Sequence, residues 1–244
     1  MKRLITLIMI VISISGNSQT MLVPGGDVIE RKWVRNNTSK MSWYAVRDTA
    51  RFRIGEISTQ VLTGQGNLIV VTRVELAQSK SDWVDSTIAD EQTLRAIRHS
   101  SYNAQRDMVV DFGKPITGYH VDKRSGKKLL LSDTVNAGFF DSNIYPAMIP
   151  WLPLKEGYKQ EISIYDFNPA SRSGLMKAWI RDVKTGVLQT EKSGERKVWV
   201  VSVTDEIGDG TNGSSTYYID MEDRRVWKQE IDVKGSKLLL QLEE

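Results

Sequence analysis

Apolar and polar residues alternate with a period of two along most of the chain. In residues 68–76, for example, Leu68, Val70 and Val74 fall on one face of the predicted strand, a pattern typical of a sheet that buries one face. β-branched and aromatic residues are frequent in such segments, as a half-buried pleated surface favours. Turn signals such as Ser125-Gly126 and Lys234-Gly235 separate the segments at short spacing. The pattern predicts a mainly β protein whose antiparallel strands are joined by hairpins.

Two segments depart from this alternation. Residues 139–152 place apolar side chains at helical spacing, and Asp141 or Ser142 could cap a helix there. Pro146 and Pro150 predict that this helix is short or split. Residues 90–99 suit a helix by propensity and a strand by alternation. The residues alone leave both alternatives open for that segment.

The chain begins with Met1-Lys2-Arg3, an apolar run over residues 4–14, and then small residues up to Ser18. This order predicts a secretory signal peptide over residues 1–18. The alternative, a membrane-spanning helix, would need about 20 apolar residues, more than the run provides. Residues 19–29 are predicted to be a flexible leader, and residues 30–244 a single antiparallel β domain.

The amino-acid composition limits where the protein is located and which kinds of reactive site it can contain. The 244 residues include no cysteine, which excludes disulfides, thiolate metal ligands and the acylated cysteine of a bacterial lipoprotein. A secreted eukaryotic domain would more often carry disulfides. We therefore expect a periplasmic or secreted bacterial protein, with no transmembrane anchor after signal cleavage. The net charge of +3 argues against a nucleic-acid partner.

Candidate catalytic groups are few. His99 and His120 lie in no metal-spaced motif and are predicted to be exposed strand residues. Ser125 and Lys128 match the S-x-x-K pattern, but the basic run over residues 123–128 is predicted to be a solvated hairpin turn, where the lysine would not be desolvated. We expect no enzymatic activity.

One loop has the composition of a cation site. Asp205, Asp209 and Asn212 resemble an oxygen-rich calcium loop, but the closing glutamate of such loops is missing. A hairpin loop between two strands explains the same residues. We expect no metal and no other cofactor.

Two stretches carry a resemblance to a known family. Residues 149–158 (IPWLPLKEGY) have the form of a short helix that ends in a turn into a strand, and residues 217–227 (YYIDMEDRRVW) that of a strand, an acidic turn and a strand. Residues 90–94 (DEQTL) are a weaker third match. The chain resembles an uncharacterised family of exported bacterial proteins that is known only as a domain of unknown function. The signal sequence followed by Gln19 is similar to exported proteins of the Bacteroidetes type.

The resemblance implies a fold like that of the periplasmic lipoprotein carriers LolA and LolB. In that fold a curved antiparallel sheet, or half-barrel, surrounds one or two short helices and leaves an apolar cavity. The resemblance favours a strand over residues 90–99. The chain has no recognisable carrier-specific residues, so the resemblance transfers neither carrier activity nor a site residue.

The expected function is therefore non-catalytic binding of a lipid or other apolar ligand in the concave sheet. The candidate lining residues come from the alternating rows and the short helix; they are Trp43, Leu68, Val70, Val74, Trp151, Ile162, Ile164, Trp179 and Trp199. The alternative is a structural or accessory envelope protein with a packed core, which binds a protein partner through a sheet edge or loops.

Overall fold

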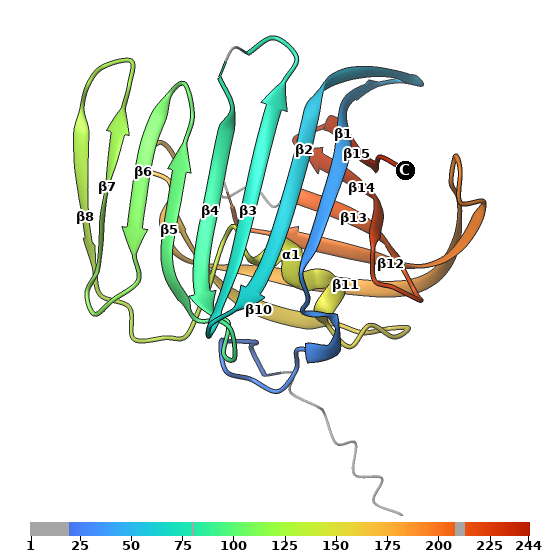
Figure 1. Ribbon diagram of the computed structural model, residues 1–244, viewed down its shortest axis with the longest axis horizontal. Helices are drawn as coiled ribbons and strands as arrows, with labels where there is room; N and C mark the ends of the chain where they lie inside the picture. Colours follow the sequence, from blue (N-terminus) through green and yellow to red (C-terminus); the bar gives the residue numbers. More distant parts are fainter. Residues whose placement is uncertain (1–19, 80, 208–212) are drawn as a thin grey trace, which may run out of the picture.

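The computed structural model of the chain describes residues 20–79, 81–207 and 213–244. They form one large, curved antiparallel sheet that does not close, with a short helical segment against its concave face (Figure 1). The predicted fold class is confirmed. The signal peptide predicted over residues 1–18 lies outside the described residues.

The elements follow one another in chain order with short connections. Those of the first half are η1 (Arg31–Trp33), β1 (Asn37–Arg47), β2 (Ala50–Gly64), β3 (Asn67–Leu76), β4 (Trp83–Asp90), β5 (Ala96–Tyr102), β6 (Arg106–Asp111), β7 (Ile116–Asp122) and β8 (Lys128–Asp133). Those of the second half are β9 (Phe140–Asp141), α1 (Tyr145–Met148), η2 (Ile149–Trp151), β10 (Gln160–Phe167), β11 (Ser173–Gln189), β12 (Glu195–Asp205), β13 (Gly213–Asp220), β14 (Val226–Val233) and β15 (Ser236–Leu242).

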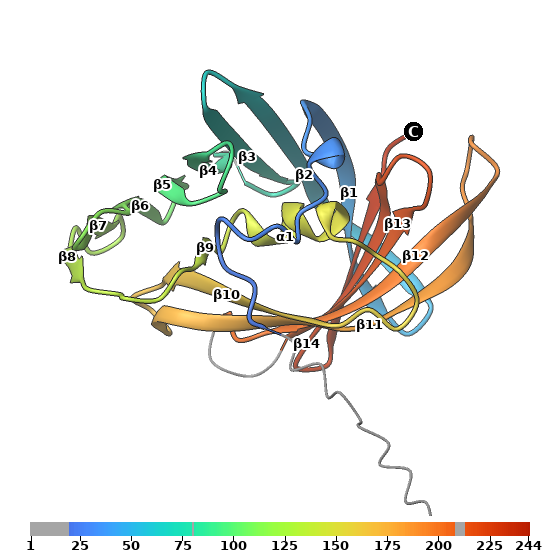
Figure 2. The same ribbon diagram turned by 90° about the horizontal axis from the view of Figure 1, so that it is seen from below.

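The sheet has two halves, which we call the N-terminal wing (β1–β8) and the C-terminal wing (β9–β15). Its strand order is β8-β7-β6-β5-β4-β3-β2-β1-β15-β14-β13-β12-β11-β10-β9. The wings meet where β1 pairs with β15, with Met41 opposite Leu242. Figure 2 shows that the wings curve toward each other and enclose α1 between them.

The helical segment is short, as Pro146 and Pro150 predict. It comprises α1 and then the 3-10 turn η2, over residues 145–151. The expected caps are absent, because the residue at the N-cap position, Ile144, makes no side-chain cap hydrogen bond. Asp141 and Ser142 instead use their side chains elsewhere: Asp141 bonds His99, and Ser142 Oγ donates to Asp166 Oδ1 at 2.7 Å. Competing long-range partners thus replace the local cap.

The main core lies between this helical segment and the concave face. Fully buried side chains from α1, η2 and the following loop, such as Met148 and Leu152, pack against apolar rows of both wings. The C-terminal wing contributes, for example, Ile164 and Val201. Covering these rows removes a large apolar area from water, and this burial contributes most to the stability of such a fold.

A smaller core joins the open edges of the two wings. Tyr165 on β10 packs against Phe112 and Phe139, with ring centroids at 5.9 and 5.1 Å. Its hydroxyl donates to Asp133 Oδ2 at the end of β8, at 3.0 Å. The edge strand β9 pairs in parallel with β10. Side-chain packing therefore holds the edges of the sheet near each other.

Residues 20–29 differ from the flexible leader that the sequence predicts. Leu22 is buried and forms a parallel bridge with Ile162; its N–H donates to the Glu161 carbonyl at 2.7 Å. Ile29 is also buried in the main core. The apolar side chains of this segment find places in the core, which offsets the entropy lost when the segment is ordered.

The segment over residues 90–99 is neither a continuous helix nor a continuous strand. β4 ends at Asp90, a tight turn follows, and β5 begins at Ala96. The Asp90 carboxylate accepts hydrogen bonds from the N–H and the hydroxyl of Thr93 at 2.7 and 2.6 Å. Leu94 then takes a left-handed conformation with φ of 60°. The strand that the resemblance favours is present over residues 96–99, whereas residues 91–95 form the turn.

The turn between β13 and β14 has the same construction. Asp220 accepts from the N–H of Glu222 at 2.8 Å, and Arg224 has a φ of 63°. In the β4–β5 turn the Leu94 N–H donates to the Asp90 carbonyl. At the equivalent position of the β13–β14 turn, the Arg224 N–H donates to the Asp220 carbonyl. The chain carries two matching turns, one in each wing, although no internal repeat is visible in the sequence.

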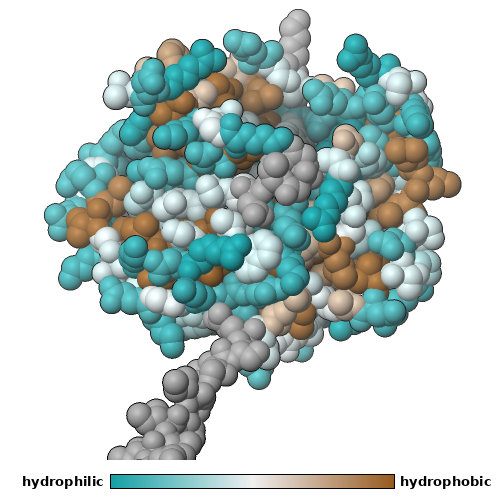
Figure 3. Space-filling view, turned by 180° about the vertical axis from the view of Figure 1, so that it is seen from behind, coloured by the Kyte–Doolittle hydropathy of each residue, from teal (hydrophilic) through white to brown (hydrophobic). Residues whose placement is uncertain are grey.

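The face of the molecule seen from behind (Figure 3) and the turn between β7 and β8 are both mainly polar. Seen from behind, the surface is largely hydrophilic with separate hydrophobic patches (Figure 3). The basic run over residues 123–128 forms the predicted turn between β7 and β8, where the Asp122 carboxylate caps Arg124 and Ser125 N–H groups. Among the described residues, no helix has the length and apolar character needed to cross a bilayer.

Candidate functional site

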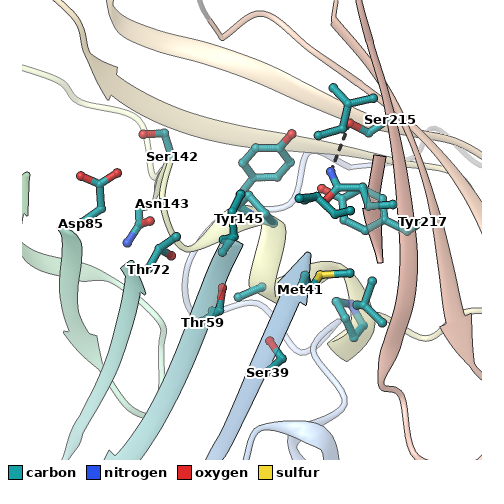
Figure 4. A pocket seen from close by; sticks show the side chains of 18 of the residues that line it. Ser39, Met41, Thr59, Thr72, Asp85, Ser142, Asn143, Tyr145, Ser215 and Tyr217 are labelled. Atoms are coloured by element: carbon teal, nitrogen blue, oxygen red, sulfur yellow. Dashed lines mark hydrogen bonds between the residues drawn. The ribbon is translucent and has the colours of Figure 1, made fainter. Parts of the chain in front are cut away.

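A cavity of about 1280 Å³ lies in front of the part of the concave face that the helical segment leaves uncovered. Small-molecule sites usually measure roughly 300–1,000 Å³, so this space is large enough for an extended ligand. Both wings and α1 contribute to its lining. In Figure 4, Tyr145 of α1 stands between strands of the N-terminal wing, which present Ser39 and Thr59, and Tyr217 of the C-terminal wing.

Strand alternation determines which side chains face the cavity. Lining residues recur at every second position in β2 and β13: Ile57, Thr59 and Val61; Gly213, Ser215 and Tyr217. On β1 the lining residues run without a gap over residues 37–41 and include Ser39 and Met41. These rows mix apolar side chains with small hydroxyl side chains. The cavity therefore presents an amphipathic wall.

The predicted lining residues occupy several different places. Trp151 lines the cavity. Four others, Leu68, Val70, Ile162 and Ile164, lie completely buried in the main core. Trp199 is half-buried and packs against the same core, and Val74 is buried on β3 opposite Ile57.

The two remaining tryptophans lie outside that core. Trp43 is half-buried on β1, opposite Gly55 and Leu240 in the register of the neighbouring strands. Trp179 alternates with the buried Ala178 and Ile180 and so lies on the other face of β11, where the Arg181 guanidinium is 4.4 Å from its ring centroid. The structure therefore brings Trp151 to the cavity and places these two apart from it.

One polar cluster lies where β5 approaches β9. His99 is 6% exposed, and its Nδ1 is 2.8 Å from Asp141 Oδ2. Thr87 Oγ1 donates to the same Asp141 oxygen and is 3.3 Å from His99 Nδ1. Asn143 Nδ2 donates to Thr87 Oγ1 at 3.1 Å. These side chains link β4 and β5 of one wing to β9 of the other.

The charges around His99 favour its protonated form. Burial acts to lower the pKa of His99, but the carboxylates of Asp141, Asp85 and Asp166 raise it, and the net pKa is above its ordinary value. His99 Nε2 is buried with no hydrogen-bond partner in the described part of the chain, and the ring lines the cavity. A protonated His99 would therefore offer a donor on this side.

A second polar contact lies at the helical segment. The Tyr145 hydroxyl donates to Asp205 Oδ2, and both side chains line the cavity. Burial raises the pKa of Asp205, while the hydrogen bond from Tyr145 acts to lower it. Burial also raises the pKa of Tyr145 well above its ordinary value. The phenol thus stays protonated and acts as a hydrogen-bond donor.

A basic cluster surrounds Trp33 at the turn between β13 and β14. Arg224 Nη2 pairs with Glu30 Oε2 at 3.2 Å, and the Trp33 indole N–H donates to the same oxygen at 3.0 Å. The guanidinium carbon of Arg224 is 5.3 Å from the Trp33 ring centroid. Arg35 Nη2 donates to the Asp223 carbonyl at 3.2 Å. Burial lowers the pKa of Arg224, and Glu30 opposes that effect.

The arrangement around His99 differs from a hydrolytic triad. In a triad the acid and the nucleophile contact opposite ring nitrogens of the histidine. Here Thr87 and Asp141 both approach Nδ1. Ser125 lies in the exposed β7–β8 turn, where its hydroxyl accepts from the Lys127 N–H at 3.3 Å. The lining of the cavity offers apolar side chains, hydroxyl groups and charged groups.

No group of three or more His, Asp or Glu side chains that could hold a metal ion is found within residues 20–79, 81–207 and 213–244. Of the loop whose composition resembles a calcium site, Asp209 and Asn212 lie outside the described residues. Asp205 directs one carboxylate oxygen to the Tyr145 hydroxyl.

Sequence patterns do not reveal the polar clusters of the cavity. The prediction that His99 is exposed is wrong, because His99 and Ser101 form the buried side of β5. Their polar character hides the alternation that marks apolar strands. Arg224 stands in the sequence only as part of an acidic turn. Its equivalence to the buried Leu94 is visible only in the structure, because residues 90–94 (DEQTL) and 220–224 (DMEDR) share only the aspartate.

Comparison with known proteins gives one match. The model of the DUF3108 family, described as proteins of unknown function, matches residues 38–242. No curated protein and no solved structure matches the chain. The matched range runs from β1 to β15 and so includes both wings, the helical segment and the cavity. The chain belongs to the DUF3108 family of proteins of unknown function.

Proposed function

We propose that this protein binds a single lipid or similar amphiphile in the cavity between its two wings, without chemical conversion of the ligand. The observation that carries the proposal is the cavity of about 1280 Å³ with its amphipathic lining. Apolar side chains such as Met41, Ile231 and Leu240 line it together with hydroxyl and charged groups. Such a wall suits a ligand that has both a hydrocarbon chain and a polar end.

The energetics allow hydrocarbon burial to provide most of the affinity. Each buried methylene contributes about 0.8 kcal/mol, so a chain of about twelve carbons gains on the order of 10 kcal/mol before association costs are subtracted. The helical segment lies between the wings and borders this space (Figure 2). Pro146, Ala147 and Pro150 line the cavity from that segment.

We further propose that the protein is exported to the periplasm or secreted, and that its fold is like that of the lipoprotein carriers LolA and LolB. The composition of residues 1–18 supports export. The curved open sheet around a short helical segment supports the likeness in fold.

A matched pair of tryptophan variants tests the binding site. Thr59 lines the cavity, whereas Gln60, its neighbour on β2, is exposed and does not share that face. Thr59→Trp should weaken the binding of laurate by at least about tenfold, equivalent to about 1.4 kcal/mol, because the indole occupies ligand space. Isothermal titration calorimetry measures the change.

The Gln60→Trp variant is the control and should bind laurate as the unchanged protein does. If both variants bind laurate with the affinity of the unchanged protein, laurate binds outside the cavity. If neither laurate nor any other amphiphile binds the unchanged protein, the proposed function is wrong.

A second candidate function is favoured by the free edge of the N-terminal wing. β8 is the last strand on that side of the sheet, and Leu130 on it is 79% exposed. Such an edge could pair with a strand of an envelope protein. The same titration separates the two functions, because an accessory protein of this kind would bind no amphiphile.

A further inference from the structure

We propose that Arg224, with Arg35 and Arg225, binds the anionic headgroup of the amphiphile whose chain lies in the cavity. This inference rests on the proposed function and names the ligand class. All three arginines line the cavity, and so do the apolar residues Trp151 and Val226 beside them. Headgroup and chain sites are therefore continuous.

The first argument is the unused hydrogen-bonding capacity of Arg224. Its side chain is only 10% exposed. Glu30 pairs with Nη2, whereas Nε and Nη1 are buried and have no hydrogen-bond partner in the described part of the chain. Unsatisfied buried donors on a charged group are costly. Oxygens of a carboxylate or phosphate could accept from these donors one at a time, because Nε and Nη1 lie on different edges of the guanidinium.

The second argument comes from the matching turn of the other wing. Leu94 has the same left-handed conformation and the same backbone hydrogen bond as Arg224, and it is completely buried in the main core. The turn geometry is thus satisfied by a buried apolar residue, which needs no desolvation of a charge. An arginine at the equivalent place is not required by the fold, so its charge calls for a functional explanation.

The third argument is the excess of positive charge around this turn. Among the described residues, five cationic side chains lie around this turn with four carboxylates: Lys32, Arg35, Arg196, Arg224 and Arg225 with Glu30, Asp220, Glu222 and Asp223. Arg196 pairs with Asp220 and Glu222, which leaves Glu30 and Asp223 for the other four cations. Glu30 already accepts from Trp33 and pairs with Lys32 and Arg224. The cluster therefore has positive charge left for an anion. By contrast, the His99 cluster of the same cavity contains several carboxylates, which would repel one.

The fold itself provides the substitution that tests the inference. Arg224→Leu places at β13–β14 the residue that the β4–β5 turn already accommodates, so the variant should fold. Arg181→Gln is the matched control, because it removes one positive charge from an exposed residue that packs on Trp179, outside the cavity. Thermal unfolding of both variants confirms that they are folded before binding is compared.

Binding is measured by calorimetry with dodecyl phosphate and dodecanol, both below their aggregation concentrations, and with inorganic phosphate. The unchanged protein and Arg181→Gln should bind dodecyl phosphate about tenfold or more tightly than dodecanol. Arg224→Leu should bind the two alkyl ligands about equally. Inorganic phosphate alone should bind far more weakly than dodecyl phosphate.

The outcomes separate this inference from the function on which it rests. If the unchanged protein shows no preference for the phosphate ligand, or if Arg224→Leu keeps that preference, the headgroup assignment is wrong while cavity binding stands. If inorganic phosphate binds as tightly as dodecyl phosphate, the site is one for a free anion and the amphiphile assignment is wrong. If neither alkyl ligand binds any variant, the proposed function itself fails.

Discussion

The buried contact between His99 and Asp141 links the two wings. This contact connects β5 to β9, two strands that lie far apart in the order of the sheet. The pair is almost completely buried, with side-chain exposures of 8% and 3%. Breaking a buried pair is costly because one charge is left without a partner. Stability should therefore depend on the protonation of His99.

The direction of that dependence follows from the raised pKa of His99, whose ordinary value is 6.5. A raised pKa in the folded state means that the stabilisation is complete below about pH 6.5 and is lost as the pH rises through the folded-state pKa. Each unit by which the pKa is raised contributes about 1.4 kcal/mol. Urea unfolding between about pH 5.5 and pH 9 should show the free energy of unfolding falling with pH in this range.

His99→Gln removes the titrating group and should flatten this dependence. Asp85, Asp141 and Asp166 act on the His99 ring, and Arg106 acts on Asp166. The variant is therefore compared with the unchanged protein at every pH. A pH dependence that is identical in both proteins would show that other groups are responsible.

Among elements, β7 depends on the close approach of its backbone to β6. Gly118 lies opposite Val110, and a Cβ atom at Gly118 would be 2.1 Å from the Val109 carbonyl oxygen. Gly118→Ala should lower the free energy of unfolding by about 1–3 kcal/mol, because the strands must move apart. Chemical denaturation measures this change.

Gly213→Ala on β13 is the matched control. Among the described residues, a Cβ atom there would have only Asp205 Oδ1 nearby, at 4.0 Å. We expect this variant to keep the stability of the unchanged protein. Equal stability of Gly118→Ala and Gly213→Ala would mean that β6 and β7 are not packed as described.

Strands and turns are the features most open to prediction from the sequence, because both depend on local chemistry. Period-two alternation predicts strands such as β3, and Pro146 and Pro150 correctly predict a short helical segment. The caps are not predictable in this way. Asp141 bonds His99, which is 42 residues away in the chain, and no local pattern reports such a partner.

The cavity is harder to predict for a reason that concerns whole faces of the sheet. The most apolar rows, which include Leu68 and Ile164, are those that the helical segment covers, because burying them is most favourable. The open space lies beside rows with polar members such as Ser39 and Thr59. Hydrophobicity alone therefore indicates the core and not the cavity.

At the scale of the whole molecule, two wings of one sheet curve toward each other and are held by side chains at their open edges. Residues 20–35 contact the matching turns of both wings: the Gly25 N–H donates to the Thr93 carbonyl, and Glu30 pairs with Arg224. The N-terminal segment, the helical segment and the edge contacts together fix the spacing of the wings. This spacing sets the size of the cavity, on which the proposed function depends.

The most direct test of that function is native mass spectrometry of the full chain purified from its own cells, followed by solvent extraction of the same sample. We predict a protein ion with the added mass of one amphiphile, and an extract that contains a lipid with an anionic headgroup. A protein ion with the mass of the polypeptide alone, which also takes up no lipid when lipids are added, would contradict the account.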